Sequence, residues 1–170
     1  NADQGMFGSD FRSSERFAQT FFQVSGRAGR RKEVGEVFLQ TYNPTNPLLN
    51  TIISQDYNTF FSEAVLERKV PLWPPYSHLA VLHAQSTQKN YVFNFLKAIE
   101  AKGNNINSGN TMLLGPVPSP IEKKAGKFRG QLLLLNTNRK ELHQFLDEFC
   151  FVIKNSNKTS KVKWSLDVDP

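Results

Sequence analysis

The sequence predicts an α+β protein whose C-terminal part has the order β-α-β-β-α-β, a split βαβ domain with two helices on one face of a four-stranded sheet. Polar and apolar residues alternate over 77–85, as expected for a half-buried strand. Apolar residues recur at helical spacing over 88–101 and again over 139–153. Together, these two periodicities indicate strands that alternate with long amphipathic helices.

The first residues are expected to form a loop followed by a helix. Residues 1–11 lack periodicity and contain two glycines and two aspartates, which is typical of a loop. A serine at 13 or 14 can cap a helix that runs through residue 24. Phe17, Phe21 and Val24 then form an apolar stripe that needs a partner surface.

The next segment is expected to be a strand followed by two helices. Residues 37–39 have the composition of a strand, and the Asn–Pro steps after them predict a short helix over 48–54. Another helix begins at Asp56 and ends before the proline-rich residues 71–76. Trp73 and Tyr76 could stack on bases there or pack against a neighbouring domain; the packing interpretation is favoured.

The C-terminal elements follow from the same periodicities. Strands are expected over 77–85, 111–117, 128–135 and 162–168, with helices over 88–101 and 139–153. Residues 103–109 are rich in glycine and asparagine, which predicts a loop after the first of these helices. Prolines at 116, 118 and 120 are expected to break the second strand.

Composition limits the class of function. The chain has 170 residues, a net charge of +6 and a pI near 9.5, which favours an anionic partner, nucleic acid first. The lone Cys150 excludes a disulfide framework and a cysteine-rich zinc site within these residues. The three histidines lack ligand spacing, so no metal site is predicted. With no signal peptide and no membrane-spanning stretch in the sequence, a cytoplasmic protein is expected.

A Gln followed by two Gly–Arg pairs stands out at residues 23–30. Guanidinium groups never lose their charge and pair bidentately with phosphate oxygens, so Arg27 and Arg30 suit a polyphosphate. Gly26 would let the backbone turn or approach a ligand closely. A solvated basic loop at the end of a helix is an equally open interpretation.

This stretch resembles motif VI of the superfamily 2 helicases, which has the pattern Gln-x-x-Gly-Arg-x-x-Arg. The resemblance implies that Gln23 and Gly26 face a nucleotide and that Arg27 and Arg30 act as arginine fingers on the transferring phosphoryl group. Residues 2–6 resemble the end of motif V, which implies that Asp3 and Gly5 lie near the nucleotide and DNA. An ordinary flexible terminus is the alternative.

Residues 115–131 include the densest basic run of the chain. A hairpin with interleaved Phe128 is a plausible nucleic-acid contact, whereas lysines that protect a sheet edge are the alternative. Lys158, Lys161 and Lys163 could extend the same field. The cations of the run are Lys123, Lys124, Lys127 and Arg129.

Several segments, in order, resemble the primosomal protein N′ (PriA) family of bacterial replication-restart helicases. They are Pro-Pro-Tyr-Ser-His-Leu-Ala at 74–80, Gly-Pro-Val-Pro at 115–118, Lys-Ala-Gly-Lys-Phe-Arg at 124–129, Gln-Leu-Leu-Leu at 131–134 and Lys-Trp-Ser-Leu-Asp-Val-Asp-Pro at 163–170. The resemblance covers the whole chain, because motif V and motif VI precede these segments in the family's order.

This resemblance implies an ATP-dependent 3′→5′ DNA helicase that binds forked and single-stranded DNA and reloads the replicative helicase through the primosome proteins. It implies ATP and Mg in the whole protein, and zinc elsewhere in that protein. It also implies that Arg139, at the start of the last helix, binds the acidic tail of single-stranded DNA-binding protein; a solvated first-turn arginine is the open alternative.

The sequence also departs from a complete helicase. It has no Gly-rich phosphate-binding loop with lysine, no Asp–Glu metal motif and no cysteine cluster. We therefore expect a C-terminal fragment that cannot hydrolyse ATP alone. Residues 1–45 would be a remnant of a RecA-like helicase lobe, 46–76 a helical linker and 77–170 the α+β domain. Without the resemblance, a free-standing basic RNA- or protein-binding domain is the alternative.

Overall fold

The computed structural model describes residues 2–6, 12–28, 35–54, 57–107, 109–156 and 161–170. The chain divides into two compact units, Asn1–Val70 and Pro71–Pro170. The regular elements described in the first unit are all helices, and the second unit combines helices with a sheet, so the predicted α+β class is confirmed. Each unit is described separately below.

The helices of the N-terminal unit pack around small apolar clusters. These helices are α1 Ala2–Met6, α2 Ser13–Ala28, α3 Pro47–Ile53 and α4 Tyr57–Glu67. Ala18, Ile52 and Phe60 are fully buried where α2, α3 and α4 meet. The Asn46 side chain accepts a hydrogen bond from Leu49 N and caps α3, as the Asn–Pro step predicts.

Three expectations for this unit are wrong. Residues 2–6 form α1 rather than a loop, and α2 continues to Ala28 instead of ending at residue 24. Residues 37–39 do not form a strand, and Phe38 is 90% exposed. That segment lies instead beside α1, where Ala2 N donates a hydrogen bond to Gln40 O. Of the predicted apolar stripe on α2, Phe17 and Phe21 pack inward, whereas Val24 is exposed.

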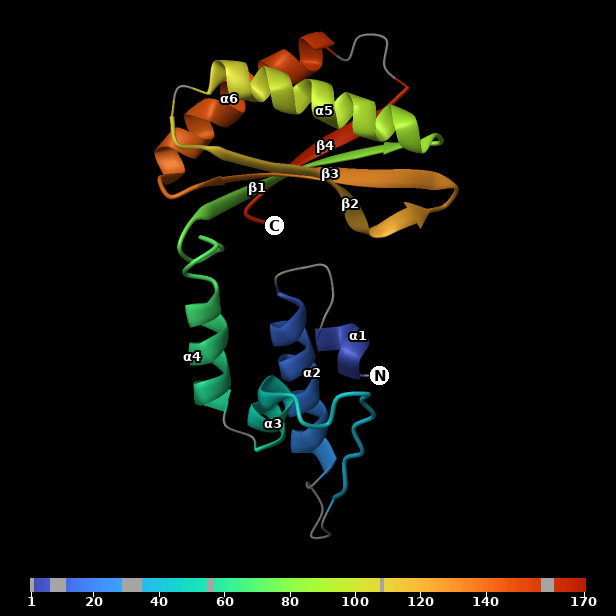
Figure 1. Ribbon diagram of the computed structural model, residues 1–170, viewed down its shortest axis with the longest axis vertical. Coiled ribbons are helices and arrows are strands. Elements are labelled where there is room, and N and C mark those ends of the chain that lie inside the picture. The colour runs from blue at the N-terminus through green and yellow to red at the C-terminus, as the bar shows by residue number, and fades with distance from the viewer. Residues whose placement is uncertain (1, 7–11, 29–34, 55–56, 108, 157–160) are drawn as a thin grey trace. The chain divides into compact units, whose positions relative to one another are not determined.

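The C-terminal unit is a four-stranded antiparallel sheet with both of its helices on one face (Figure 1). The strand order across the sheet is β2-β3-β1-β4, so β1 and β3 are central and β2 and β4 are edges. In chain order the elements are β1 His78–Ser86, α5 Lys89–Ile106, β2 Met112–Lys124, β3 Lys127–Asn136, α6 Arg139–Ser156 and β4 Lys163–Val168.

The core of this unit lies between the sheet and its helices. The inward residues of α6 are all buried, in agreement with the predicted apolar face; they are Leu142, Phe145, Leu146 and Phe149. On α5 the buried positions include Val92, Leu96 and Ile99. From the sheet, Ala80, Leu82, Leu132 and Leu134 complete this layer. Successive residues of a strand face opposite sides of the sheet. The residues that alternate with these core positions therefore lie on the face away from the helices, here called the open face.

Two boundaries in this unit differ from the expectation. The helix α5 does not end near residue 101, because Gly103 continues it and packs beneath Phe149 and Leu113. The strand β2 extends to Lys124 through all three prolines. It can do so because it is an edge strand, where a missing N–H is tolerated, and its pairing with β3 has irregularities after Leu114 and after Pro118.

Candidate functional site

The Gln–Gly–Arg stretch lies on the last two turns of α2. Gln23, Gly26 and Arg27 are exposed and share one helix face, at spacings of three and four residues. Gly26 is helical, so it does not turn the chain, and a Cβ added there would meet open space. The second predicted finger, Arg30, lies outside the described residues. The surface over Gly26 could therefore admit a ligand to the helix backbone.

Asp3 and Gly5 have clear packing roles on α1. The Asp3 carboxylate accepts hydrogen bonds from Tyr42 N at 2.9 Å and from Thr41 Oγ1 at 2.8 Å. These bonds, the backbone one foremost, lower the pKa of Asp3. A Cβ on Gly5 would lie 2.7 Å from the Phe17 ring, so glycine lets α1 approach α2. Both residues thus hold the segment after α2 and the α1–α2 contact in place.

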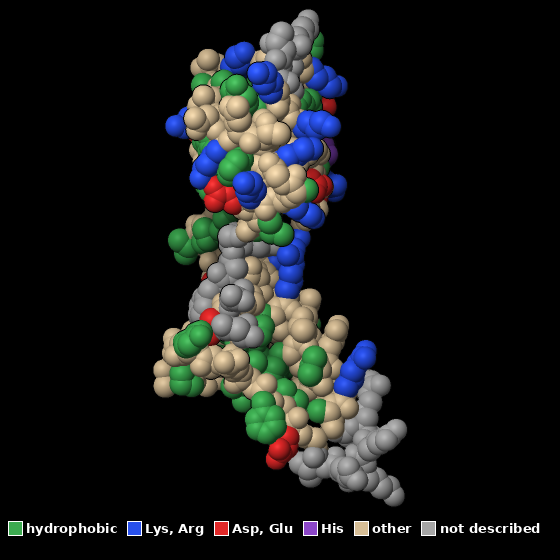
Figure 2. Space-filling view, turned by 90° about the vertical axis from the view of Figure 1, so that its right-hand side faces the viewer, with side chains coloured by type: hydrophobic (Ala, Val, Ile, Leu, Met, Phe, Trp, Pro, Cys, Tyr) green, Lys and Arg blue, Asp and Glu red, His purple; other side chains and the backbone are tan. Residues whose placement is uncertain are grey.

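Cationic side chains gather at the end of the C-terminal unit formed by the β2–β3 hairpin. Figure 2 looks onto this end and shows Lys and Arg side chains spread over it with few acidic side chains among them. Ser86 pairs with Phe128, and the Ser86 hydroxyl donates to Lys161 O, so the ends of β1, β3 and β4 meet here. We call this surface the basic end; its cations are Lys89, Lys123, Lys124, Lys127, Arg129, Lys161 and Lys163.

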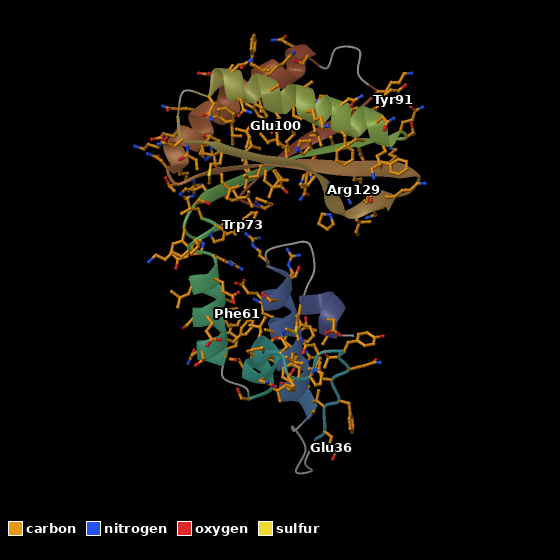
Figure 3. The ribbon with its side chains drawn as sticks, in the orientation of Figure 1. Glu36, Phe61, Trp73, Tyr91, Glu100 and Arg129 are labelled. Carbon is orange, nitrogen blue, oxygen red and sulfur yellow. The ribbon has the colours of Figure 1, made fainter. Side chains whose placement is uncertain are left out.

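Helix α5 contributes to the basic end through its first turn. The ammonium of Lys89 lies 2.5 Å from Oε1 of Glu122 and ties the helix to the far end of β2. Figure 3 shows Tyr91 on α5 and Arg129 on β3 at this same end of the unit. A pair as exposed as Lys89 and Glu122 contributes little stability, so its main effect is to offset part of the positive charge.

The aromatic rings of the basic end are covered by its own lysines. The Nζ of Lys123 lies 4.8 Å from the ring centroid of Phe128, and that of Lys161 lies 5.4 Å from Tyr91. Both rings also pack against the core. Phe128 is therefore part of a cation–π pair rather than a free stacking surface. Phosphate contacts, rather than base stacking, are the chemistry that this end offers.

His83 lies on the open face of the sheet, one row inward from the basic end. It pairs with Gln131 on β3 and with Ser165 on β4. Its Nδ1 is buried and has no hydrogen-bond partner among the described residues. Burial lowers the pKa of His83; the nearby Asp167 acts against this shift and Arg129 adds to it.

Arg139 opens α6, as predicted, and its side chain is exposed. The guanidinium faces Asp169, near the end of the chain, with 3.7 Å between Nη2 and Oδ2. The helix start beside it is well organised, since Asn138 Oδ1 accepts from Lys140 N at 3.0 Å and from Glu141 N at 3.4 Å. Arg139 can therefore hold a carboxylate, and the chain's own carboxylate lies nearest to it.

A cavity of about 450 Å³ opens between the end of α5 and the first half of α6. Its lining includes three carboxylates, those of Glu141, Asp147 and Glu148, so it would repel an anionic ligand. Glu141 already accepts hydrogen bonds from Asn138 and Asn136 and supports the helix start. Within the described residues, no group of His, Cys, Asp and Glu side chains is arranged to hold a metal ion.

Sequence analysis did not identify every residue at the basic end and around Arg139. Lys89 belongs to the basic end but lies far from the hairpin in sequence, and Asp169 was not connected with Arg139. Sheet register brings Lys163 opposite Gln85, which itself pairs with Arg129. Strand pairing and tertiary ion pairs reveal these neighbours. Lys158, expected in the same field, lies outside the described residues.

Comparisons with known proteins point to one family. Residues 71–170 match the primosomal protein N C-terminal domain family. A replication restart protein PriA from Haemophilus influenzae is 39% identical over the whole chain, one from Synechocystis is 35% identical over 78% of it, and one from Bacillus subtilis is 30% identical over all of it.

The matched region coincides with the second compact unit, which carries the basic end and Arg139. The chain spans 23%, 16% and 21% of the lengths of these three relatives. Among the described residues, no helix is long and apolar enough to cross a membrane. The family match covers more than half of the chain, and the chain therefore belongs to the primosomal protein N C-terminal domain family.

Proposed function

We propose that this chain is the C-terminal part of an ATP-dependent 3′→5′ DNA helicase that restarts stalled replication forks through the primosome. In this proposal the unit 71–170 is a module that binds forked and single-stranded DNA and partner proteins. The observation that carries it is the basic end, where cations from β2, β3, β4 and α5 gather in a domain of this family.

The chemistry of the basic end favours the phosphate backbone. Lysines and an arginine attract phosphates whatever the base sequence, and binding releases counterions. Lys124 pairs directly with Lys127 across the hairpin, so two like charges face each other beside the turn. Such a pair is unfavourable without a partner, and an anionic ligand would relieve the repulsion. Arg129 extends the same surface onto the open face.

The finer fold assignment belongs to this proposal as well. We infer the split βαβ topology from the element order and from the strand order β2-β3-β1-β4, with α5 and α6 on one face. We also infer that the N-terminal unit includes part of a RecA-like helicase lobe, over residues 1–45, followed by a helical linker. The exposed Phe38 and Tyr42 are compatible with burial against further parts of such a lobe.

In the whole protein, the exposed face of α2 would reach ATP. Arg27, with Arg30, would stabilise charge on the transferring phosphoryl group, while Gln23 and the open backbone at Gly26 would approach the nucleotide. Asp3 and Gly5 would hold the neighbouring segment. The phosphate loop, the magnesium ligands and the zinc-binding cysteines would come from the remainder of the protein, so this chain alone would not hydrolyse ATP.

The start of α6 is proposed to bind a protein partner. Arg139 would hold the acidic tail of single-stranded DNA-binding protein through a charge-assisted hydrogen bond, helped by the N-terminal amides of α6. Arg139 follows β3 at the end of the sheet where Asn136 pairs with His78, whereas the basic end lies where Phe128 pairs with Ser86, so DNA and the tail would occupy different parts of the unit.

A charge-reversal experiment tests the DNA proposal. The change Lys124→Glu with Lys127→Glu should weaken binding to a forked DNA for all sequences and flatten the salt dependence. The matched control is Lys97→Glu with Lys154→Glu, which changes net charge equally on α5 and α6. If the control weakens binding as much as the hairpin variant, the basic end is not the DNA site.

A further inference from the structure

The open face of the sheet carries two rows of polar residues, the first at the basic end and the second just inside it. Cross-strand pairing places Gln85 of β1 between Arg129 of β3 and Lys163 of β4. The next row has His83 between Gln131 and Ser165. We call these six residues the polar platform. Three neighbouring strands thus contribute two residues each to one surface.

The side chains of the platform all point away from the helices. Ala84 and Trp164, which alternate with platform residues along β1 and β4, pack in the core beneath α5 and α6. On β3, a Cβ added to Gly130 would lie 3.0 Å from Leu96 and Val92 of α5. Because successive residues of a strand face opposite sides, Arg129 and Gln131 lie on the open face.

The platform combines positive charge with hydrogen-bonding groups. Arg129 and Lys163 flank the amide of Gln85, and Gln131 and Ser165 flank the imidazole of His83. The acid nearest to the platform on β4 is Asp167, which pairs with Val81 in the following row. The Nδ1 of His83 is buried, so Gln131 and Ser165 supply the accessible hydrogen-bonding groups of that row. Such a surface complements an anion that carries many oxygen acceptors.

We propose that the polar platform binds the sugar–phosphate backbone of a DNA single strand that crosses β3, β1 and β4 next to the basic end. The inference rests on the proposed DNA-binding function and assigns to it a surface outside the hairpin. Arg129 and Lys163 belong to both surfaces, so a DNA strand that leaves the hairpin passes directly onto the platform.

The width and composition of the platform favour binding of a single DNA strand through its sugar–phosphate backbone. With neighbouring strands about 4.8 Å apart, the outer Cα positions of a row lie roughly 10 Å apart. The platform has no aromatic residue, since the nearby rings of Phe128 and Trp164 pack on the helix side. Base stacking therefore has no surface here, and binding would depend weakly on sequence.

Fluorescence anisotropy of labelled oligo-dT with the full 170-residue chain tests the proposal. Lys163→Glu should weaken binding about tenfold and reduce the slope of log K against log salt by about 0.7 for the lost phosphate contact. Gln85→Lys adds a cation to the centre of the row and should tighten binding, with a slope steeper by about 0.7. Oligo-dA should give the same changes as oligo-dT.

The two proposals fail in different ways. If the unchanged chain does not bind DNA at all, the proposed function fails. If the hairpin variant Lys124→Glu with Lys127→Glu weakens binding while Lys163→Glu and Gln85→Lys leave affinity and slope unchanged, the platform proposal is overturned and the proposed function stands. Gln85→Lys is a gain-of-binding variant, so its result does not depend on loss of folding; circular dichroism confirms that each variant is folded.

Discussion

The guanidinium of Arg139 lies 3.7 Å from the carboxylate of Asp169, so two residues at opposite ends of the last helix–strand pair face each other. Both side chains are largely exposed, 66% for Arg139 and 48% for Asp169. Such a pair contributes little to stability. Its consequence concerns binding instead, because a carboxylate of the same chain competes with any acidic partner for Arg139.

We expect Asp169→Asn to strengthen binding of an acidic tail peptide to the chain. Removing the competing carboxylate leaves Arg139 free and removes a like charge from the approaching tail, a gain of at most about fivefold for an exposed pair. Peptide titration at low salt measures it, and Asp167→Asn is the matched control. If Asp169→Asn weakens binding of the tail peptide and Arg139→Ala leaves that binding unchanged, the tail does not use Arg139.

His83 predicts a pH dependence of stability. Burial lowers the pKa of His83 in the folded state below its ordinary value of 6.5. The unfolded chain therefore takes up the proton first, and the free energy of unfolding falls as pH drops from about 6.5 and levels off below the folded pKa. Above 6.5 the contribution of His83 is complete.

The variant His83→Gln isolates this effect. It has no titrating group, so urea unfolding between pH 7.5 and 5 should show a smaller loss of stability on acidification than the unchanged chain. His143→Gln, an exposed change on α6, is the control. An identical pH dependence for His83→Gln and the unchanged chain would contradict the prediction.

The periodicity of apolar residues was sufficient to predict the helices and strands that bury one face. The alternation that places Leu132 and Leu134 inward, and the spacing of Leu142 and Phe149, are direct consequences of burial against one core. Sequence reasoning failed where a tertiary contact decides the local structure. Gly103 looked like the start of a loop, yet it fits beneath Phe149 and keeps α5 helical.

The candidate site was predictable only in part, for a related reason. The hairpin lysines are close in sequence, so their charge is visible as a run. Lys89, Lys163 and Gln85 join them only through the pairing of β1 with β3 and β4 and through the contact of α5 with β2. Strand register depends on contacts between residues far apart in the chain, and one sequence alone does not specify it.

Asn136 is expected to be important for stability. It is 1% exposed; its amide donates to Thr111 Oγ1 at 2.9 Å, and its oxygen accepts from Asn138 N at 2.7 Å. Asn136→Leu removes these hydrogen bonds to Thr111, before β2, and to Asn138, before α6, and should reduce the free energy of unfolding by about 1–3 kcal/mol. Urea unfolding measures it. The exposed Asn94→Leu on α5 should cause no comparable loss.

Two helical glycines should respond oppositely to alanine. At Gly103 a Cβ would lie 2.7 Å from Leu113 Cδ2 and from the Phe149 ring, so Gly103→Ala should destabilise the chain by about 1–3 kcal/mol. At Gly26 nothing lies within 4 Å, so Gly26→Ala should stabilise α2 by up to about 1 kcal/mol. Thermal unfolding of both variants tests this contrast.

Gly26→Ala also separates packing from function, because its methyl group would stand where a nucleotide is proposed to approach α2. In the whole protein, a more stable Gly26→Ala variant should lose DNA-stimulated ATP hydrolysis, as should Arg27→Ala, whose side chain is exposed. Thr20→Ala, an exposed change two turns earlier on α2, serves as the control and should retain activity. Full activity in Gly26→Ala and Arg27→Ala alike would mean that this face of α2 does not meet the nucleotide.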